Sequence, residues 1–236
     1  AVWFDTGWES ADTYTFISEY GAQVVGKPII RLAAGLPVPD GLADECAELE
    51  GMLGRRSDMI RRCLKYACLP YRLQRWCTRD LKLTPFARWA RSQGPFVNAI
   101  GVRAAESKAR SRLDDWEQHP ALGEVEVWRP IFRWSEDDVI AAHHEYGLPV
   151  NPLYLRGSRR VGCWPCVMAG KHEIRTIATD DPERIAVIRR LEEIIQLRVA
   201  KTRGETRTVG WFMNPRPVRD PVTRRVVPGQ GGCWPI

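Results

Sequence analysis

Hydrophobic and polar positions along this chain follow two periods, one typical of strands and one typical of helices. Short apolar runs of the strand type, bounded by turn residues, recur four times. They are "AVWF" (1–4), "PIIRLA" (28–33), "FVNAIGV" (96–102) and "EVEVWRPI" (124–131). The segments between them favour helices, so the sequence predicts strands that alternate with helices.

Four of these intervening segments carry clear helix signals. They are "SADTYTFISEYGAQVV" (10–25), "LKLTPFARWARSQG" (81–94), "WSEDDVIAAHHEYGLP" (134–149) and "DDPERIAVIRRLEEIIQLRVAK" (180–201). Ser10, Ser135 and Asp181 stand at N-cap positions, and Pro182 suits a first helical turn. Residues 40–75 have a weaker helical pattern without clear bounds.

This order of elements predicts an α/β fold with a doubly wound, mostly parallel sheet. In such sheets ligands bind beyond the carboxyl ends of the strands. The loops "DTGWE" (5–9) and "RAAES" (103–107) directly follow predicted strands and are candidate substrate loops. From Gly210 onward the chain holds five of its seventeen prolines and should be irregular. We therefore expect an α/β domain at 1–209 and a proline-rich C-terminal tail at 210–236.

Composition narrows the class of protein. The chain has 236 residues, of which 44% are hydrophobic and 27% charged, as in ordinary globular proteins. No apolar run approaches the roughly 18 residues of a membrane span, and no secretory signal is visible. Seven unevenly spread cysteines fit a reducing cytoplasm better than a disulfide framework. A net charge of +6 favours anionic partners such as nucleotides or nucleic acid, although a solvated basic surface explains it equally well.

The cysteine pair in "RVGCWPC" is the strongest chemical signal. Cys163 and Cys166 have the C-x-x-C spacing that lets two thiolates reach one metal centre, but a closed site needs four ligands. Cys63, Cys68 and Cys77 lie upstream as candidates for the remaining ligands. Spacing alone does not choose between zinc and an iron–sulfur cluster. The competing interpretation is that these are small buried apolar residues.

A second candidate is the polar stripe in "RAAESKAR". Arg103, Glu106, Ser107 and Arg110 share one face if this segment is a helix. From spacing alone, the simpler interpretation is a surface ion pair between Glu106 and Arg110. Such a pair would stabilise the helix by only a few tenths of a kcal/mol.

Five segments, taken in order, resemble the phosphoadenosine phosphosulfate (PAPS) reductase family. "FDTGWESADTYTFI" (4–17) is similar to its "DTG…ET" loop and helix, and "IGVRAAESKAR" (100–110) to its "G-x-R…S…R" strand and loop. "CTRDLKLTPF" (77–86) resembles its Cys-Cys-x-x-Arg-Lys…Pro segment, with Thr78 in place of the second cysteine. "RPIFRWSEDDVIAAHHEYGLPVNPLY" (129–154) and "GSRRVGCWPC" (157–166) resemble the two stretches that follow.

The resemblance implies the adenine-nucleotide α-hydrolase-like fold of the PP-loop superfamily. Members normally open with a strand and a Ser-Gly-Gly-x-Asp-Ser phosphate loop before the "DTG" strand. This sequence begins at the later strand, so we expect an incomplete copy that lacks the N-terminal strand and phosphate loop. The alternative is a chain that does not hydrolyse nucleotides by itself.

The resemblance also assigns binding residues. It implies that Asp5, Thr6 and Gly7 contact the adenosine of an adenine nucleotide, either PAPS or ATP with magnesium. It further implies that the stripe after the third strand binds the anionic phosphate or sulfate, because guanidinium groups form paired hydrogen bonds with such anions. The residues expected there are Arg103, Ser107 and Arg110.

A metal centre follows from the same resemblance. Cys77, Cys163 and Cys166 match ligands of the four-iron, four-sulfur cluster (4Fe–4S) found in one branch of the family, with zinc as the alternative. The fourth ligand normally adjoins Cys77, and here we expect Cys68, which is nearer in sequence than Cys63.

The implied function is an enzyme in sulfur chemistry: reduction of a sulfonucleotide by a cysteine thiolate, giving sulfite and an adenosine phosphate, with a thiol electron donor as partner. Two alternatives remain open. One is an ATP-dependent sulfurtransferase that acts on nucleic acid with a sulfur donor. The other is a non-catalytic nucleotide- or DNA-binding component of a larger assembly.

Cys233 in "GQGGCWPI" is the expected catalytic thiol. Reductases of the family carry their catalytic cysteine in a short C-terminal tail as a Glu-Cys-Gly signature. In this chain Gly232 precedes the cysteine and Trp234 follows it, which departs from that signature. The competing interpretation is an incidental terminal thiol.

Overall fold

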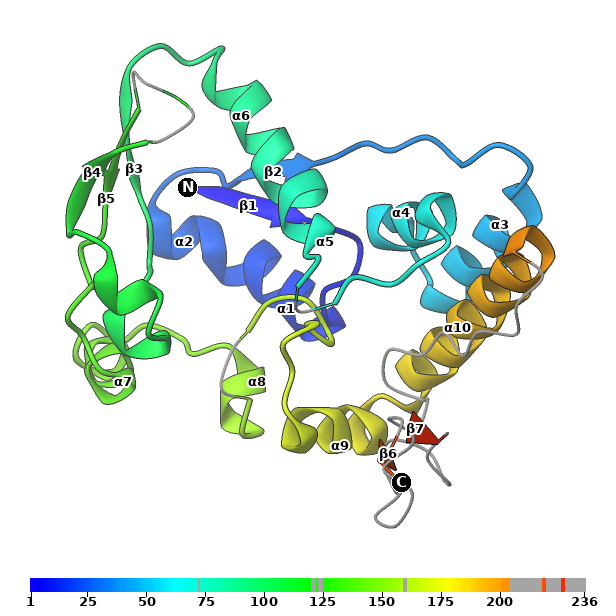
Figure 1. Cartoon of the computed structure of the whole chain (residues 1–236). Coiled ribbons are helices and arrows are strands. Elements are labelled where there is room, and N and C mark those ends of the chain that lie inside the picture. The colour runs from blue at the N-terminus through cyan, green and yellow to red at the C-terminus, as the bar shows by residue number, and fades with distance from the viewer. Residues whose placement is uncertain are drawn as a thin grey trace.

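The computed structural model describes residues 1–71, 73–119, 122, 125–158 and 161–203, together with two short strands in the tail. In the body of the molecule the strands form two sheets (Figure 1). In the first, β1 (Val2–Asp5) pairs in parallel with β2 (Ile30–Ala33). In the second, β5 (Val125–Trp128) lies between the parallel β3 (Phe96–Ala99) and the antiparallel β4 (Trp116–Gln118).

The α/β class with parallel strands is therefore confirmed. Two features differ from the expectation: β4 was not predicted, and the parallel pairs stand in separate sheets across the described residues. Strand pairing joins segments far apart in the sequence, so the local pattern that predicts a strand does not say which sheet it enters.

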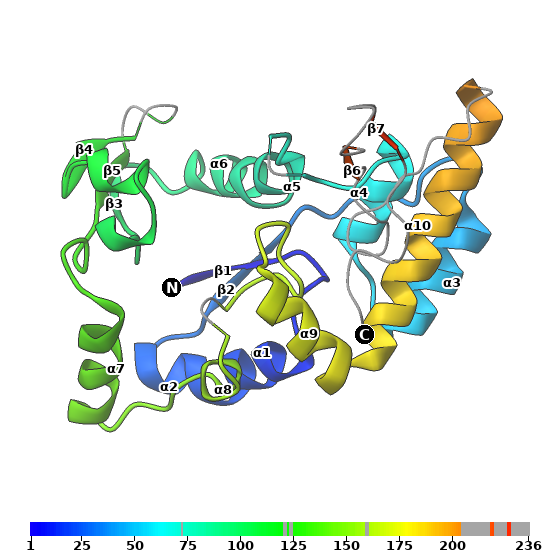
Figure 2. The same ribbon diagram turned by 60° about the horizontal axis from the view of Figure 1, so that its bottom comes forward.

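Helices cover both faces of the β1–β2 pair (Figure 2). One face is covered by a continuous helical segment that consists of α1 (Ala11–Phe16), the π-helical turn η1 (Ile17–Gly21) and α2 (Ala22–Val25). A second such segment covers the opposite face. The second consists of α5 (Trp76–Thr78), the π-helical turn η2 (Arg79–Leu83) and α6 (Thr84–Ala90). The predicted cap is confirmed, because the Ser10 hydroxyl accepts the backbone N–H of Asp12 at 3.3 Å.

A helical layer lies beside this sheet and holds the main core. Its members are α3 (Ala43–Leu53), α4 (Asp58–Tyr66), α9 (Lys171–Asp180) and α10 (Pro182–Arg203). The long helix α10 packs along α3 and α4 (Figure 1). Its apolar residues Ile185, Ile188, Leu191 and Ile195 are buried. Asp181 Oδ1 accepts the N–H of Arg184 at 3.0 Å as the expected cap. Helix α9 was not predicted.

The remaining elements of the central part of the chain are short. These are the 3₁₀ turns η3 (Ala104–Glu106) and η4 (Arg110–Arg112) and the helices α7 (Glu136–Glu145) and α8 (Pro152–Leu155). Among them, α8 contacts α1. The capping box predicted for α7 is present: the N–H of Asp138 donates to Ser135 Oγ at 3.0 Å, and the N–H of Ser135 donates to Asp138 Oδ2 at 2.7 Å.

Within the described ranges, no helix is both long and apolar enough to cross a membrane. In the tail, β6 (Val218–Arg219) pairs with the antiparallel β7 (Val226–Val227). The expected domain boundary at 209/210 and the candidate thiol Cys233 lie outside the described residues.

Candidate functional site: an aromatic cleft beside a cysteine cavity

The "DTGWE" loop after β1 folds around its own carboxylates. Glu9 accepts the backbone N–H of Thr6 at 3.1 Å, the Thr6 hydroxyl at 2.7 Å and the N–H of Trp8 at 3.1 Å. Asp5 accepts the N–H of Gly7 at 2.8 Å and the Tyr14 hydroxyl at 2.5 Å. Asp5, Thr6 and Glu9 are all buried. Their polar atoms therefore fix the shape of the loop.

Gly7 makes a close backbone contact within the protein. Its φ of +69° lies in the left-handed region, and a Cβ there would stand 2.4 Å from the Arg56 carbonyl oxygen and from the Ser57 Cα. Glycine is thus required here by the close approach to the chain at the start of α4. Asp5, Thr6 and Gly7 shape this loop, and their expected contact with an adenosine stays a prediction.

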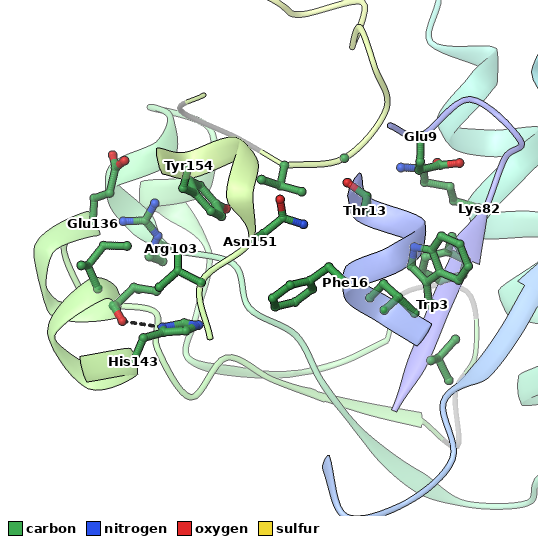
Figure 3. A pocket seen from close by; sticks show the side chains of 18 residues that line it. Trp3, Glu9, Thr13, Phe16, Lys82, Arg103, Glu136, His143, Asn151 and Tyr154 are labelled. Atoms are coloured by element: carbon green, nitrogen blue, oxygen red, sulfur yellow. Dashed lines mark hydrogen bonds between the residues drawn. The ribbon is translucent and has the colours of Figure 1, made fainter. Parts of the chain in front are cut away.

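An open cleft of about 430 Å³ lies between β1, α1, α7 and α8 (Figure 3). We call it the aromatic cleft. Figure 3 shows Trp3 and Phe16 across from Tyr154. The polar side chains that line it include both acids and bases: Glu9, Lys82, Arg103, Glu136, His143 and Asn151. Apolar walls with a few charged groups are typical of small-molecule sites of this size.

A second cavity, of about 390 Å³, adjoins the first, and we call it the cysteine cavity. Three of the predicted thiols line it: Cys77, Cys163 and Cys166. Cationic side chains from separate elements line it as well: Arg75, Lys82 and Arg110. Lys82 lines both the aromatic cleft and the cysteine cavity, so it stands where the two spaces meet.

The electrostatics of this junction couple the thiols to Lys82. Burial raises the pKa of Cys163 to about 12, and the nearby Lys82 opposes that shift. Burial and the neighbouring Cys166 raise the pKa of Cys77. In turn, the Cys163 sulfur raises the pKa of Lys82, and Glu9 adds to this effect. Burial of Lys82 opposes both but does not outweigh them. Lys82 is therefore held as a cation.

The predicted polar stripe is split between the two spaces. Ser107 has an extended backbone (φ −171°, ψ 156°) that separates η3 from η4, so the segment is not one helix. Arg103 lines the aromatic cleft, whereas Ser107 and Arg110 line the cysteine cavity. Glu106 lies between the two arginines, ion-paired with Arg110 and 4.0 Å from Arg103 Nε. The Glu106–Arg110 ion pair is therefore present, and the two arginines also line the cleft and the cavity.

The donor set suits a metal centre in part. Cys77, Cys163 and Cys166 are soft ligands on one cavity, which fits iron–sulfur or zinc chemistry. Cys68, the expected fourth ligand, does not line that cavity. Across the part of the chain that the structure describes, no three His, Cys, Asp or Glu side chains are grouped closely enough to hold a metal ion. The three thiols line one cavity without forming a metal site there, and a metal centre on them stays a prediction.

Two site residues were missed from the sequence. Lys82 lies within the quoted segment "CTRDLKLTPF", five residues after Cys77, but its charge was not singled out. The π-helical turn η2 places it between cleft and cavity. Glu9 ends the "DTGWE" loop, and its carboxylate reaches within 4.0 Å of the Cys163 sulfur. The signal that could have identified each residue was its position within a segment already recognised, "CTRDLKLTPF" for Lys82 and "DTGWE" for Glu9.

The geometry defines the class of protein: an α/β protein whose aromatic cleft, lined by both acidic and basic side chains, adjoins a cavity of thiols. Residues 54–169 match the family model of the phosphoadenosine phosphosulfate reductase domain. The match confirms the resemblance to the PAPS reductase family that was seen in the motifs.

Individual relatives share parts of this chain. An adenosine 5'-phosphosulfate reductase from Allochromatium vinosum is 32% identical over 70% of this chain and 57% of its own length. An adenosine 5'-phosphosulfate reductase from Burkholderia cepacia is 35% identical over 41% of this chain and 38% of its own length. An uncharacterized 37.8 kDa protein of Escherichia phage 186 is 42% identical over 40% of this chain and 29% of its own length. The chain thus spans less than two thirds of each of these curated relatives.

Among solved structures, a PAPS reductase from Candida auris in complex with phosphate is similar over 69% of this chain and 68% of its own. The sequence identity is 18% and the TM-score is 0.44. A likeness this low adds nothing to the family assignment.

Proposed function

We propose that this chain forms the nucleotide-binding and cysteine-bearing part of a sulfonucleotide reductase. Its substrate class is an adenosine phosphosulfate, with or without a further phosphate on the ribose. The observation that carries the proposal is the position of Lys82, which lines both the aromatic cleft and the cysteine cavity. The cation lies where an anionic group bound in the cleft would meet the thiols.

The cleft supplies complementary groups for such a nucleotide. Trp3, Phe16 and Tyr154 offer ring faces for the adenine, since base–aromatic stacking contributes about 1–3 kcal/mol per base. Arg103 and Lys82 supply positive charge for the phosphosulfate. An arginine can bind such an anion through two aligned hydrogen bonds, and a lysine acts as a point charge.

The reaction needs one thiol from this protein and one from a donor. A cysteine thiolate, for which we propose Cys233, attacks the sulfate sulfur. The bond between that sulfur and the phosphate oxygen breaks, which releases the adenosine phosphate and leaves a cysteine S-sulfonate. A donor thiol then attacks the cysteine sulfur, so that sulfite leaves and a disulfide forms. Lys82 and Arg103 would stabilise the charge that develops on the departing phosphate.

Cys77, Cys163 and Cys166 would hold an iron–sulfur centre in the cysteine cavity. When bound, such a centre supplies electron transfer and local charge beside the cleft. Lys82 would separate that centre from the bound anion and balance the charge of its thiolates.

Calorimetry on the complete protein tests the binding step, with adenosine phosphosulfate, PAPS and ATP·Mg as separate ligands. Arg103→Ala should weaken binding of a phosphosulfate nucleotide about 10- to 150-fold, the equivalent of about 1.5–3 kcal/mol for a charge-assisted hydrogen bond. Arg91→Ala is the matched control, because Arg91 is exposed and lines neither the aromatic cleft nor the cysteine cavity. Equal affinity in the two variants would return Arg103 to the surface-ion-pair interpretation.

Sulfite release tests the reaction class. Adenosine phosphosulfate with a small dithiol should give sulfite and an adenosine phosphate in equal amounts, and Cys233→Ser should abolish that release. If sulfite is never formed while ATP drives incorporation of sulfur into nucleic acid, the sulfurtransferase alternative replaces this proposal.

A further inference from the structure

Two cysteines that take no part in the proposed reaction meet at the C-terminal end of α4. Cys63 lies in the last turn of the helix and is fully buried in the main core. Cys68 follows the helix and packs on the same core, where it remains partly exposed. Neither residue lines the cysteine cavity, so the pair lies outside it.

The chain reverses at this helix end in such a way that Cys68 returns to Cys63. The N–H of Ala67 donates to the Leu64 carbonyl and the N–H of Cys68 to the Cys63 carbonyl, both at 3.3 Å. These two bonds form the helix ending in which the side chains at the positions of Cys63 and Cys68 pack on each other. Backbones joined by a direct hydrogen bond lie about 5–6 Å apart, within the roughly 4.4–6.8 Å that separates the Cα atoms of a disulfide.

Ala67 holds this reversal in a conformation that costs energy. Its φ of 48° and ψ of 37° lie in the left-handed region, where helix ends usually place glycine. Among the described residues, Ala67 alone has a positive φ without being a glycine. A backbone outlier of this kind persists only where the surrounding structure fixes it. Here it brings the two cysteines together.

The electrostatics show that the two thiols interact. Burial raises the pKa of Cys63 well above its usual value, and the neighbouring Cys68 and Cys77 add to the effect. Cys68 is the more accessible of the pair, since Cys63 has no exposed surface. An oxidant from solution therefore reaches the Cys68 sulfur first.

We propose that Cys63 and Cys68 are a redox pair whose sulfurs join in a reversible disulfide across the C-terminal end of α4. The oxidant is a small-molecule disulfide such as glutathione disulfide. The Cys68 thiolate attacks one of its sulfurs, the sulfur–sulfur bond breaks, and one glutathione leaves. Cys63 then gives up its proton and attacks the Cys68 sulfur, so that the second glutathione leaves and the internal disulfide forms. The protein loses two electrons to the oxidant, and the two cysteine protons end on the two glutathione thiols.

The disulfide would act on the connection between α4 and α5. The Cys68 thiol lies beside the side chain of Trp76, which begins α5 and directly precedes Cys77 of the cysteine cavity. Tyr66, the last residue of α4, stacks on the same tryptophan with ring centroids 5.5 Å apart. Oxidation would therefore stiffen the segment that carries Cys77 into the cavity, and reduction would release it.

Peptide mapping of the complete protein tests the pair, because trypsin cuts between its two members. Cleavage after Arg62, Lys65 and Arg72 places Cys63 in the peptide 63–65 and Cys68 in the peptide 66–72. After incubation with excess glutathione disulfide and alkylation of the remaining thiols, the two peptides should appear as one disulfide-linked species. Dithiothreitol should restore both thiols.

Two variants distinguish the attacking sulfur from the resolving one. Cys68→Ser should give neither the linked species nor a glutathione adduct at Cys63. Cys63→Ala should keep glutathione bound at Cys68, because no second sulfur displaces it. Cys46→Ala is the matched control, since it also removes a cysteine buried in the main core, and it should form the link as wild type does.

Thermal unfolding measures the consequence for the fold. Oxidised wild type should melt about 4–8 °C above the reduced protein, because the disulfide closes a short loop of the unfolded chain. Cys68→Ser should melt at the same temperature after either treatment. A lower melting temperature of oxidised wild type would show that the native backbone does not accommodate the bond, and would overturn the reversible pair.

The wild-type peptide map decides the proposal even if a variant does not fold. Glutathione retained on Cys68, two unlinked alkylated peptides, or a link from Cys63 to Cys77 would each overturn it. None of these measurements depends on a bound nucleotide or on sulfite release, so the redox pair and the proposed function stand or fall separately.

Discussion

The helical layer and the second sheet of this protein are packed very differently. In the layer formed by α3, α4, α9 and α10, the core side chains Ile60, Leu191 and Ile195 are at most 1% exposed. The β3–β5–β4 sheet has only a small core, where Val125 packs with Phe86 and Ala90 of α6, and its surroundings are sparsely packed. Helix α7 has no buried residue, and Trp116 and Trp128 remain 49% and 42% exposed.

This difference in packing implies that the cysteine cavity and the aromatic cleft differ in rigidity. The cysteine cavity is built on segments that contact the well-packed helical layer, so its thiols should have fixed positions. The aromatic cleft has β1, α1 and the anchored α8 along its wall, with Leu153 of α8 buried in the main core, whereas the sparsely packed α7 closes the remaining side. Elements with few buried contacts open most readily, so the α7 wall should be the part that adjusts to a nucleotide.

The largest effect is expected from a cavity in the helical layer. Ile188→Ala removes a side chain that is 1% exposed in α10 and should lower the free energy of unfolding by about 3–4 kcal/mol. Ile140→Ala on α7 is the matched change in the sparse region and should cost about 1 kcal/mol, because Ile140 is only half-buried. Urea denaturation measures both. Equal losses would show that the two regions are packed alike.

Gly7→Ala tests the contact that joins the "DTGWE" loop to α4. The new methyl would have a strained φ and would collide with backbone atoms of Arg56 and Ser57, so the variant should lose about 2–3 kcal/mol. Gly26→Ala has a similar φ of +66° but no atom within 4 Å, and it should lose about 1 kcal/mol. If both variants unfold at the same urea concentration, the close contact at Gly7 does not contribute.

A partly buried ion pair between Glu50 and Arg61 should make the helical layer sensitive to acid. Burial disfavours the charged form of Glu50, but hydrogen bonds from Arg61 and from the Ser57 N–H, at 2.8 Å each, outweigh it and lower the pKa of Glu50. A lowered folded-state pKa gives stability that is complete above the unfolded value, near 4.3, and is lost as the pH falls through the folded value.

Glu50→Gln should therefore cost about 1–2 kcal/mol at neutral pH and flatten the acid limb of the stability curve. Urea unfolding from neutral pH down to about pH 3 measures this. Glu48→Gln, in the exposed pair with Arg190, is the control and should leave the curve unchanged. A parallel shift of both variants would refute the role of the partly buried Glu50–Arg61 pair.

The smallest effect is expected on the outer face of the second sheet. Trp116 and Trp128 stack there with ring centroids 6.0 Å apart, but both are largely exposed. Trp128→Thr should lower the free energy of unfolding by only about 0.5–1 kcal/mol, the contribution of an aromatic pair. A loss as large as that of Ile188→Ala would mean that this face is packed in solution.

The sequence predicted helices well where an N-cap residue stood directly before a segment with a helical pattern of apolar residues. The caps at Ser10, Ser135 and Asp181 hold the helices that the sequence assigned to them. The antiparallel strand β4 was missed because three residues between charged segments give no period to recognise. Helix α9 was missed beside the cysteine motif, although the N–H of Gly170 donates to Glu173 in a normal helix start.

Predictions for the site depended on how far apart its residues lie in the sequence. Cys163 and Cys166 were paired by spacing, and the structure places them on one cavity with Cys77. Cys68 was chosen for nearness along the chain, yet its thiol lies outside that cavity, against Trp76. Sequence distance does not measure spatial distance once a turn intervenes.

By itself, the sequence determined the alternation of strands and helices, the helix caps and the family, because each depends on residue types at short, fixed spacing. The tertiary structure alone decided that the parallel strands divide between two sheets, that Gly7 meets α4, and that Lys82 stands between the aromatic cleft and the cysteine cavity. These features arise where segments up to about a hundred and fifty residues apart pack together, as at the 4.0 Å approach of Glu9 and Cys163. Packing of the whole chain, and no local period, sets such contacts.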